Sequence, residues 1–264
     1  MLAIIRGAGD IASAIALRLH KCGISVIMTE VEHPLTVRRT VAFSEAVRSG
    51  KTQVEGIVGI RAESADDALR RALEGVIPVL VDPKCSCIWL EPDVLVDAIL
   101  AKRNVGTAID MAPIVIGVGP GFTAGDDCHA VVETMRGHTL GRVHYEGSAL
   151  PNTAVPGLVG GFAGERVLRA PNDGTFREVA SIRNHVEAGQ TVAYVDDAPV
   201  IATLTGTLRG LLAGGTRVTK GLKCGDIDPR DEVGHCETVS DKGLAVAGGV
   251  LEAILNLSGT LAKA

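Results

Sequence analysis

The chain has 264 residues, of which 46% are apolar and 3% aromatic, and its formal net charge is −5. The length fits one large domain or two small ones, and the apolar fraction is high enough for a sizeable core. This composition excludes an intrinsically disordered chain, a coiled coil and an RNA-binding platform built on aromatic stacking. Because the charge gives no net attraction to nucleic acid, we expect no nucleic-acid partner.

The start of the chain carries no recognisable targeting signal. Residues 1–10 lack the basic start and the long apolar run of a signal peptide. No segment reaches the roughly 18 uninterrupted apolar residues that a membrane-spanning helix requires. We therefore expect a cytoplasmic protein that has no membrane partner.

The first thirty residues follow the order of a dinucleotide-binding unit. Residues 2–5 form an apolar run that predicts a buried strand, and Gly7 and Gly9 predict a turn into a helix with an apolar stripe. A second predicted strand, 25–29, ends at the acidic residue Glu30. Strand, glycine turn, helix, strand and acid occur in this order in dinucleotide-binding folds.

Each residue type in this motif has a physical role. Gly7 would allow a sharp turn, Gly9 would let a pyrophosphate approach the backbone, and Glu30 would accept hydrogen bonds from ribose hydroxyls. The helix start would offer free N–H groups to phosphate, although the carboxylate of Asp10 would repel it unless it turned away as a cap. The alternative is a first turn with a purely structural role. Including two glycines of a later loop, the predicted cofactor-binding residues are Gly7, Gly9, Asp10, Ile11, Glu30, Gly119 and Gly121.

Strands and helices continue to alternate up to about residue 135. We expect strands over 54–58, 77–81, 107–109 and 114–118, and helices over 64–73 and 92–102. Parallel repeats of this kind predict an α/β domain with a Rossmann-like parallel sheet. Its ligands would lie beyond the carboxyl ends of the strands.

A second glycine-rich loop spans 117–127, where four glycines can present backbone N–H groups to an anion. Asp126, Asp127, His129 and Glu133 come at the end of this loop and just beyond it, so acids and an imidazole converge there. Such a set can perform general acid–base chemistry or hold a divalent metal; the alternative is a chain reversal capped by aspartates. We take Asp126, Asp127 and His129 as catalytic candidates and assign no metal ligands.

The sequence changes near residue 136, where short β segments punctuated by glycine and proline replace the helical pattern. Residues 186–189 (Val-Glu-Ala-Gly) recur 32 residues later as 218–221 (Val-Thr-Lys-Gly). This repeat predicts a barrel-sandwich hybrid, the fold of biotinyl and lipoyl carrier domains. The hairpin between the two copies, 194–200, contains no lysine, so we expect no covalently bound biotin or lipoate.

These patterns divide the chain into a Rossmann-like nucleotide-binding domain over 1–135, a β-rich domain over 136–235 and a C-terminal helix over 236–264. The helix begins at Ser240 and is expected to pack back on the first domain. Charged residues in this region predict an ion-pair network between the domains or one wall of a cleft. They are Asp226, Asp228, Arg230, Asp241 and Lys242.

The six cysteines form no Cys-x-x-Cys pair, so the sequence contains no local zinc or thioredoxin-like motif. Cys85 and Cys87 form a Cys-x-Cys pair, and a histidine adjoins both Cys128 and Cys236. We interpret the cysteines as isolated reduced thiols. The alternative is a metal site assembled from distant segments.

Several segments, in order along nearly the whole chain, resemble one protein family. They are Gly-Ala-Gly-Asp-Ile-Ala-Ser (7–13), Arg-Arg-Thr-Val-Ala-Phe-Ser-Glu-Ala-Val (38–47), the segment 117–134, Leu-Arg-Gly-Leu-Leu (208–212) and Gly-Asp-Ile-Asp-Pro-Arg (225–230). The family is the YqeB-type accessory family associated with selenium-dependent molybdenum hydroxylases. The Rossmann-like half is also similar to XdhC-type maturation proteins, an analogy of fold and not of site.

The resemblance implies a bacterial cytosolic protein linked to the maturation of a xanthine-dehydrogenase-like enzyme. A molybdenum hydroxylase or its maturation factors would be its partners, and the chain would hold no molybdenum centre of its own. No catalytic residue is established for the family, so none is carried over.

Three functions are consistent with the sequence. The first is an accessory protein that binds NAD(P) or a related dinucleotide. The second is an NAD(P)-dependent oxidoreductase acting on a small substrate. The third is a non-catalytic module that docks a hydroxylase subunit. A homo-oligomer is compatible with each of them.

Overall fold

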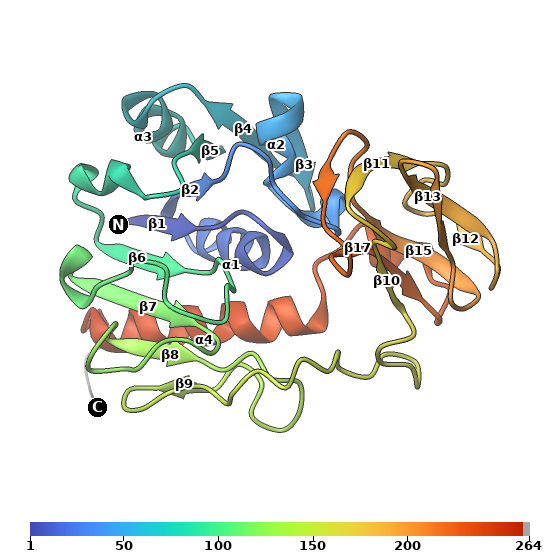
Figure 1. Ribbon diagram of the computed structural model, residues 1–264. Coiled ribbons are helices and arrows are strands. Elements are labelled where there is room, and N and C mark those ends of the chain that lie inside the picture. Colours follow the sequence, from blue (N-terminus) through green and yellow to red (C-terminus); the bar gives the residue numbers. More distant parts are fainter. Residues whose placement is uncertain (261–264) are drawn as a thin grey trace. The chain divides into compact units, whose positions relative to one another are not determined.

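The computed structural model describes residues 1–260, which form two compact units (Figure 1). The first, the sheet unit, comprises residues 1–34, 42–153 and 239–260. The second, the β unit, comprises residues 35–41 and 154–238. The chain therefore enters the β unit twice, first with the short segment 35–41.

A nine-stranded sheet forms the centre of the sheet unit, in the order β3-β4-β5-β2-β1-β6-β7-β8-β9. Its strands are β1 (Leu2–Arg6), β2 (Ser25–Glu30), β3 (Lys51–Val54), β4 (Ile57–Ala62), β5 (Ile77–Val81), β6 (Val94–Asp97), β7 (Ile114–Val118), β8 (Ala130–Val132) and β9 (Val143–His144). The strands between β4 and β8 pair in parallel, whereas β3 and β9 pair antiparallel at the two edges. The central strands are rich in Val and Ile, which suit a sheet covered on both faces.

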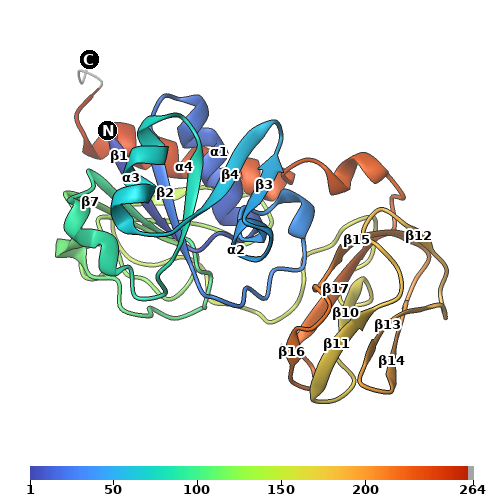
Figure 2. The ribbon, with the colours of Figure 1, turned by 90° about the horizontal axis from the view of Figure 1, so that it is seen from above.

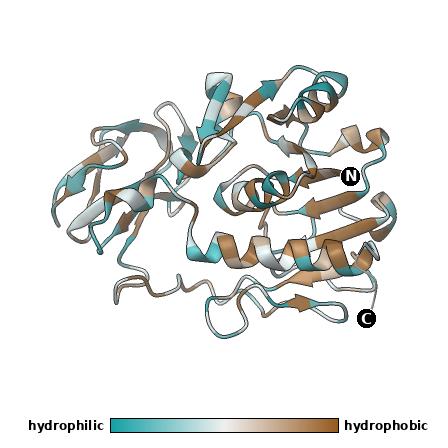
Figure 3. Cartoon of the chain, turned by 180° about the vertical axis from the view of Figure 1, so that it is seen from behind, coloured by the Kyte–Doolittle hydropathy of each residue, from teal (hydrophilic) through white to brown (hydrophobic). Residues whose placement is uncertain are grey.

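The α-helices are α1 (Asp10–Lys21), α2 (Glu45–Ser49), α3 (Ala65–Leu73) and α4 (Asp241–Leu257). The hydroxyls of Ser64 and Ser240 cap α3 and α4 by accepting a backbone N–H of the first turn. α1 and α4 lie side by side (Figures 1 and 2). Figure 3 shows hydrophobic residues along most of α4 and a hydrophilic stretch where it begins. Among the residues described, no helix is long and apolar enough to span a membrane.

Gly248 and Gly249 are neighbours in α4, but only Gly249 is tightly packed. A Cβ atom at Gly249 would lie 2.3 Å from the carbonyl oxygen of Gly141, whereas one at Gly248 would meet nothing within 4 Å. We expect Gly249→Ala to destabilise the protein by about 1–3 kcal/mol because the backbone must move. Gly248→Ala should stabilise it by up to about 1 kcal/mol through helix propensity. Thermal unfolding of both variants tests this, and equal effects would contradict the packing.

The structure corrects three predicted elements. Residues 92–102 do not form a helix, because Val94–Asp97 is the strand β6 between β1 and β7. All four residues of β6 are buried, so burial within the sheet overrides the helical spacing. The predicted strand 54–58 is interrupted by a turn at Glu55–Gly56, which separates β3 from β4. Residues 107–109 do not form the predicted strand and lead into a 3-10 turn, Ile109–Met111.

The β unit contains two four-stranded antiparallel sheets, in the orders β10-β17-β15-β12 and β14-β13-β11-β16. Their strands are β10 (Val167–Arg169), β11 (Gly174–Glu178), β12 (His185–Val186), β13 (Thr191–Val195), β14 (Ala198–Ile201), β15 (Gly206–Leu211), β16 (Arg217–Val218) and β17 (Lys223–Asp228). The sequence repeat has a structural counterpart. The short strands β12 and β16 are each followed by a glycine with positive φ, Gly189 and Gly221.

The predicted fold class is wrong. The sheet unit holds a mixed sheet and not the expected Rossmann-like parallel sheet, because its first and last strands fold back as antiparallel hairpins. The β unit holds two distinct antiparallel sheets in place of the expected biotinyl-like barrel-sandwich hybrid. Strand-rich and helix-rich segments are visible in a sequence, but strand direction at a sheet edge depends on turns that the apolar pattern does not encode.

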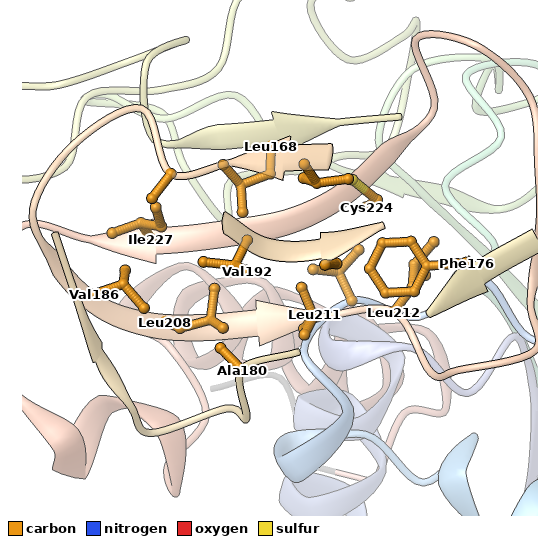
Figure 4. Close-up of a cluster of buried hydrophobic side chains, with 14 of the residues drawn as sticks. Leu168, Phe176, Ala180, Val186, Val192, Leu208, Leu211, Leu212, Cys224 and Ile227 are labelled. Carbon is orange, nitrogen blue, oxygen red and sulfur yellow. The ribbon is translucent and has the colours of Figure 1, made fainter. Parts of the chain in front are cut away.

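Buried apolar side chains fill the β unit, among them Phe176, Leu208, Leu211 and Ile227 (Figure 4). These four are 0% exposed, and burying a side chain of this size stabilises a fold by about 1.5–3 kcal/mol. Val37 belongs to the same cluster, and its carbonyl accepts the N–H of Leu211 at 2.8 Å. The segment 35–41 is thus held in the β unit by packing and by hydrogen bonding.

Candidate functional site

The carboxyl ends of the central strands meet along one edge of the nine-stranded sheet. Arg6 at the end of β1 is in register with Thr29 of β2 and with Asp97 of β6. Asp97 is in turn in register with Gly117 of β7. Because parallel strands end together, the polar residues and glycines that follow them gather at this edge.

Gly7 makes the turn that leaves β1. Its φ is +94°, a conformation that favours glycine, and a Cβ there would lie 3.0 Å from the carbonyl oxygen of Ala98. Its N–H donates to the carbonyl oxygen of Thr29 at 2.8 Å. Gly7 therefore turns the chain and also lets the segment after β6 pass close to β1.

Glu30, the predicted ribose acceptor, binds the backbone of this turn. One carboxylate oxygen accepts the N–H of Ala8 at 2.9 Å and the other accepts the N–H of Val31 at 2.8 Å. Burial raises the pKa of Glu30, and the two backbone hydrogen bonds partly oppose that shift. The Glu30 carboxylate thus holds the glycine turn in place.

The start of α1 is the predicted phosphate-binding element. Gly9 precedes the helix and has no side chain to cap it. The first N–H groups of a helix have no partner within the helix, and the helix dipole gives them a partial positive charge. Asp10 is the first residue of the helix, where the same dipole favours a carboxylate, and Ile11 is buried.

Lys242 lies near the start of α1, and the charge of Lys102 reaches it. Lys242 is the second residue of α4. Gly243 lets α4 begin close to α1, since a Cβ at Gly243 would lie 2.8 Å from the Cβ of Ala14. Lys102 lies in the loop after β6. Burial lowers the pKa of Lys242, the charge of Lys102 lowers it further, and the charge of Asp10 opposes the shift.

Burial also lowers the pKa of Lys102. A third cation, Arg136, forms a two-point ion pair with Asp241 at 2.7 and 2.9 Å. The buried carboxylate of Glu133 accepts the backbone N–H groups of Thr134, Met135 and Leu150. Arg136 and Glu133 are therefore engaged by protein groups. We call Lys102, Lys242 and the first turn of α1 the lysine site.

A buried ion pair fixes the loop that carries Lys102. Arg6 and Asp97 are 2% and 1% exposed, and they pair at 3.2 Å. The hydroxyl of Thr107 donates to Asp97 at 2.6 Å and accepts from Arg6. Arg6 also donates to the carbonyl oxygen of Val105 at 3.2 Å. The network joins the ends of β1 and β6 to the loop between β6 and β7.

The predicted anion-binding glycines Gly119 and Gly121 are packed by the protein's own atoms. The N–H of Gly119 donates to the carbonyl oxygen of Val132 at 2.8 Å, and a Cβ at Gly119 would lie 2.7 Å from Oγ1 of Thr134. A Cβ at Gly121 would lie 2.6 Å from Cα of Arg103. Both glycines allow close packing of this loop, and the Gly119 N–H is already paired.

The three catalytic candidates lie on the same loop in different environments. Asp127 accepts the N–H of Thr123 at 2.8 Å and the side-chain amide of Asn104 at 3.0 Å. Nδ1 of His129 accepts a backbone N–H of β7 at 3.0 Å, and Asp126 is exposed. The side chains of Asp127 and His129 therefore stabilise the nearby backbone through these hydrogen bonds. Within residues 1–260, no group of three or more His, Cys, Asp or Glu is placed to hold a metal ion.

A second charged cluster lies within the β unit. Asp226 and Asp228 are both 0% exposed. Asp226 pairs with Arg209 at 2.6 Å and also with Arg166. Asp228 pairs with Arg209 at 3.1 Å and with Arg230 at 2.6 Å. Each buried carboxylate is thus compensated by two guanidinium groups, as burial of a charge requires.

Sequence reasoning missed several of these residues. Arg166 belonged to no motif, and Arg209 entered only within the segment 208–212 that carries the family resemblance. Two aspartates in one strand, as in 225–228, nevertheless signal that cations must lie opposite. Lys102 was placed at the end of a helix that does not form. Arg6 ends an apolar strand directly before the glycine turn, a position at which a charged residue needs a buried partner.

The comparison with curated proteins gives one strong match. The chain is 51% identical over 257 residues to the uncharacterized protein YqeB of Escherichia coli strain K12, covering 97% of this chain and 48% of YqeB. The match supports the resemblance of this chain to the YqeB family. The chain spans about half the length of YqeB, so this identity describes one part of that protein. No protein-family model matches the chain.

The likeness to solved structures is weak. An aspartoacylase family protein from Mesorhizobium loti matches with 13% identity and a TM-score of 0.28, over 86% of this chain and 84% of that one. A succinylglutamate desuccinylase/aspartoacylase from Rhodobacter sphaeroides matches with 12% identity and a TM-score of 0.27, over 85% and 86% of the two chains. TM-scores this low do not establish a shared fold.

Proposed function

We propose that the chain binds a phosphate-bearing ligand, NAD(P) or a related dinucleotide, at the lysine site. The observation that supports this proposal is the interaction of Lys242 both with Lys102 and with Asp10, the first residue of α1, whose start has no side-chain cap. An anion placed between two repelling ammonium groups relieves their repulsion, and helix N–H groups favour the same anion. A phosphate meets both demands, because it carries negative charge and presents several acceptor oxygens.

The acidic groups around the turn are compatible with an anion. Burial raises the pKa of Glu30, so this carboxyl keeps a proton more readily than an exposed glutamate does. The carboxylate accepts the N–H of Ala8, so this backbone donor is already paired within the turn. The negative charge of Asp10 partly offsets the positive charge of the Lys242 ammonium group.

We also propose that the chain acts as an accessory protein of a molybdenum hydroxylase system, with a hydroxylase or its maturation factors as partners. The segments quoted above support this role through the family resemblance that they carry, and the match to YqeB supports that resemblance. The geometry does not favour the oxidoreductase alternative, because the side chains of Asp127 and His129 accept hydrogen bonds from nearby backbone N–H groups.

The ligand proposal is tested by calorimetric titration of the full chain with NAD⁺, NADP⁺, ADP and inorganic pyrophosphate. We expect saturable binding of at least one of these ligands. Lys102→Ala and Lys242→Ala should each weaken that binding by about tenfold or more, because each variant removes a charge-assisted contact. The affinity should also fall with rising pH before the ordinary lysine range is reached, because both lysine pKa values are lowered.

Lys51→Ala is the matched control, because Lys51 is an exposed lysine of the edge strand β3. It should leave the affinity unchanged. The proposal fails if none of the four ligands binds, or if the Lys102 and Lys242 variants bind as tightly as the unaltered chain.

A further inference from the structure

Residues 37–44 run from one unit into the other, and we call them the link segment. Residues up to Val41 belong to the β unit, and those from Ala42 belong to the sheet unit. Both of these residues are 0% exposed. Most of the link segment lies within 38–47, one of the segments that carry the family resemblance. The two ends of the link segment are hydrogen-bonded to different units.

The C-terminal end of the link segment is bound to the turn that begins α1. The N–H of Ser44 donates to the carbonyl oxygen of Ala8 at 2.9 Å, and the N–H of Phe43 donates to Oγ of Ser13 at 2.8 Å. The Ser13 hydroxyl donates to the same carbonyl oxygen of Ala8 at 3.2 Å. Ser13, Phe43 and Ser44 are at most 2% exposed. A ligand that orders residues 9–12 therefore acts on the chain between the two residues that hold the link segment.

The N-terminal end of the link segment is bound to the β unit. The carbonyl oxygen of Val37 accepts the N–H of Leu211 at 2.8 Å, and Nε of Arg39 donates to the carbonyl oxygen of Leu211 at 2.9 Å. Arg39 also pairs with Glu178 of β11 at 2.6 Å. The guanidinium of Arg38 donates to two further carbonyl oxygens of the β unit, at 2.9 and 3.1 Å. Both backbone polar groups of Leu211, in β15, are thus bonded to the link segment.

We propose that the link segment opens and closes as one cooperative unit, so that a ligand at the start of α1 also stabilises the contacts of residues 37–40 with the β unit. The part of this proposal that concerns the ligand rests on the proposed binding at the lysine site. The bonded residues Arg39 and Phe43 are joined by a 3-10 turn, Arg39–Val41, and by the buried Ala42. Because so short a connection leaves little slack, loss of the bonds at one end weakens those at the other. The coupling is reciprocal, so the β-unit contacts also raise the affinity for the ligand.

Amide hydrogen exchange in the isotope-labelled full chain, resolved residue by residue, tests this proposal. The N–H of Leu211 reports the β-unit end of the link segment, because it donates to Val37. The N–H of Ser44 reports the sheet-unit end. The N–H of Leu212, the next residue of the chain, donates to the carbonyl oxygen of Cys224 at 2.9 Å. Leu212 is therefore the internal reference for opening of the β unit itself.

Ser13→Ala removes the acceptor of the Phe43 N–H, a bond that lies wholly within the sheet unit. It should speed the exchange of Leu211 by about threefold to tenfold, the effect of losing one hydrogen bond, and leave Leu212 unchanged. Ser64→Ala is the matched control, because it removes the hydroxyl that caps α3 in the same unit. It should change neither reporter.

Arg39→Ala tests the coupling in the opposite direction. It removes the bonds to Leu211 and Glu178 in the β unit, and it should speed the exchange of Ser44 by a similar factor. Arg177→Ala is its control, because Arg177 belongs to β11 and lies over the ring of Tyr194, 4.7 Å from its centroid. This control should leave Ser44 unchanged.

Saturating inorganic pyrophosphate should slow the exchange of both Ser44 and Leu211 in the unaltered chain and leave Leu212 as it was. Slowing of Ser44 alone would overturn the coupling and leave the lysine site standing. If pyrophosphate does not bind, the ligand proposal fails by itself, and the two substitutions decide whether the link segment opens as one unit. Exchange of Leu211 that Ser13→Ala does not change, or that rises together with that of Leu212, would overturn it.

Discussion

Asp226→Ala is expected to lower the free energy of unfolding of the β unit by about 3–5 kcal/mol. Asp226 is fully buried, and its carboxylate accepts from both Arg166 and Arg209. Removing it leaves two buried guanidinium groups with less compensating charge, and desolvation of an unpaired charge is costly. Urea denaturation followed by hydrogen exchange in peptides from β15 and β17 measures the loss in this unit.

Asp231→Ala is the control for this substitution. Asp231 also accepts hydrogen bonds, from Thr207 and His185, but its side chain is 46% exposed, so the loss should be much smaller. If the two substitutions destabilise the β unit equally, the buried network does not stabilise it as described.

The same network predicts a loss of stability in acid. Burial alone would raise the pKa of Asp226, but the charges of Lys223, Arg209 and Arg166 outweigh it and hold that pKa below its usual value. A carboxyl with a lowered folded pKa stabilises fully above its unfolded pKa of about 3.9. This contribution is lost as the pH falls from there through the folded pKa. Unfolding of the β unit should therefore depend more steeply on pH below about 4 in the unaltered chain than in Asp226→Ala.

Asp97→Ala should have a comparable effect on the sheet unit, again about 3–5 kcal/mol. It would leave Arg6, which is 2% exposed, without its carboxylate partner and would remove the acceptor of the Thr107 hydroxyl. Trp89, the single tryptophan of the chain, lies in the sheet unit and reports its unfolding by fluorescence. The loop that carries Lys102 should also loosen, so pyrophosphate should bind more weakly.

Asp93→Ala is the matched control, because Asp93 immediately precedes β6, whereas Asp97 ends it. Its side chain is 57% exposed and accepts the N–H of Leu2. We expect only a small change in stability and none in ligand affinity. An Asp97→Ala variant as stable as Asp93→Ala would contradict the role given to the Arg6 network.

Local signals in the sequence predicted part of the fold. The helix start after Gly9, the strand 77–81 and the helix beginning at Ser240 follow from apolar period, glycine and capping residues, which act over a few positions. The strand β6 was misread because its neighbours β1 and β7, distant in sequence, bury it. No short-range signal indicated that residues 35–41 lie with the β unit.

The residues of the candidate site could also be predicted only in part. Gly7, Gly9 and Glu30 could be located from their spacing, but the sequence did not reveal that Glu30 binds the turn itself. Lys102 and Lys242 are separated by 140 residues, and only the packing of α4 on α1 brings the second near the helix start. Contacts between residues that are far apart in the sequence form only when the chain folds, so local patterns in one sequence do not reveal them.

The most direct test of the lysine site is a titration of the isotope-labelled full chain with NAD⁺ and with inorganic pyrophosphate, followed through its backbone amide resonances. An anion held by the helix start should shift the amides of residues 9–12, saturably, and these shifts should disappear in Lys242→Ala. If a ligand binds but the amide resonances of residues 9–12 do not shift, or if only resonances of other residues shift, the first turn of α1 does not bind the phosphate.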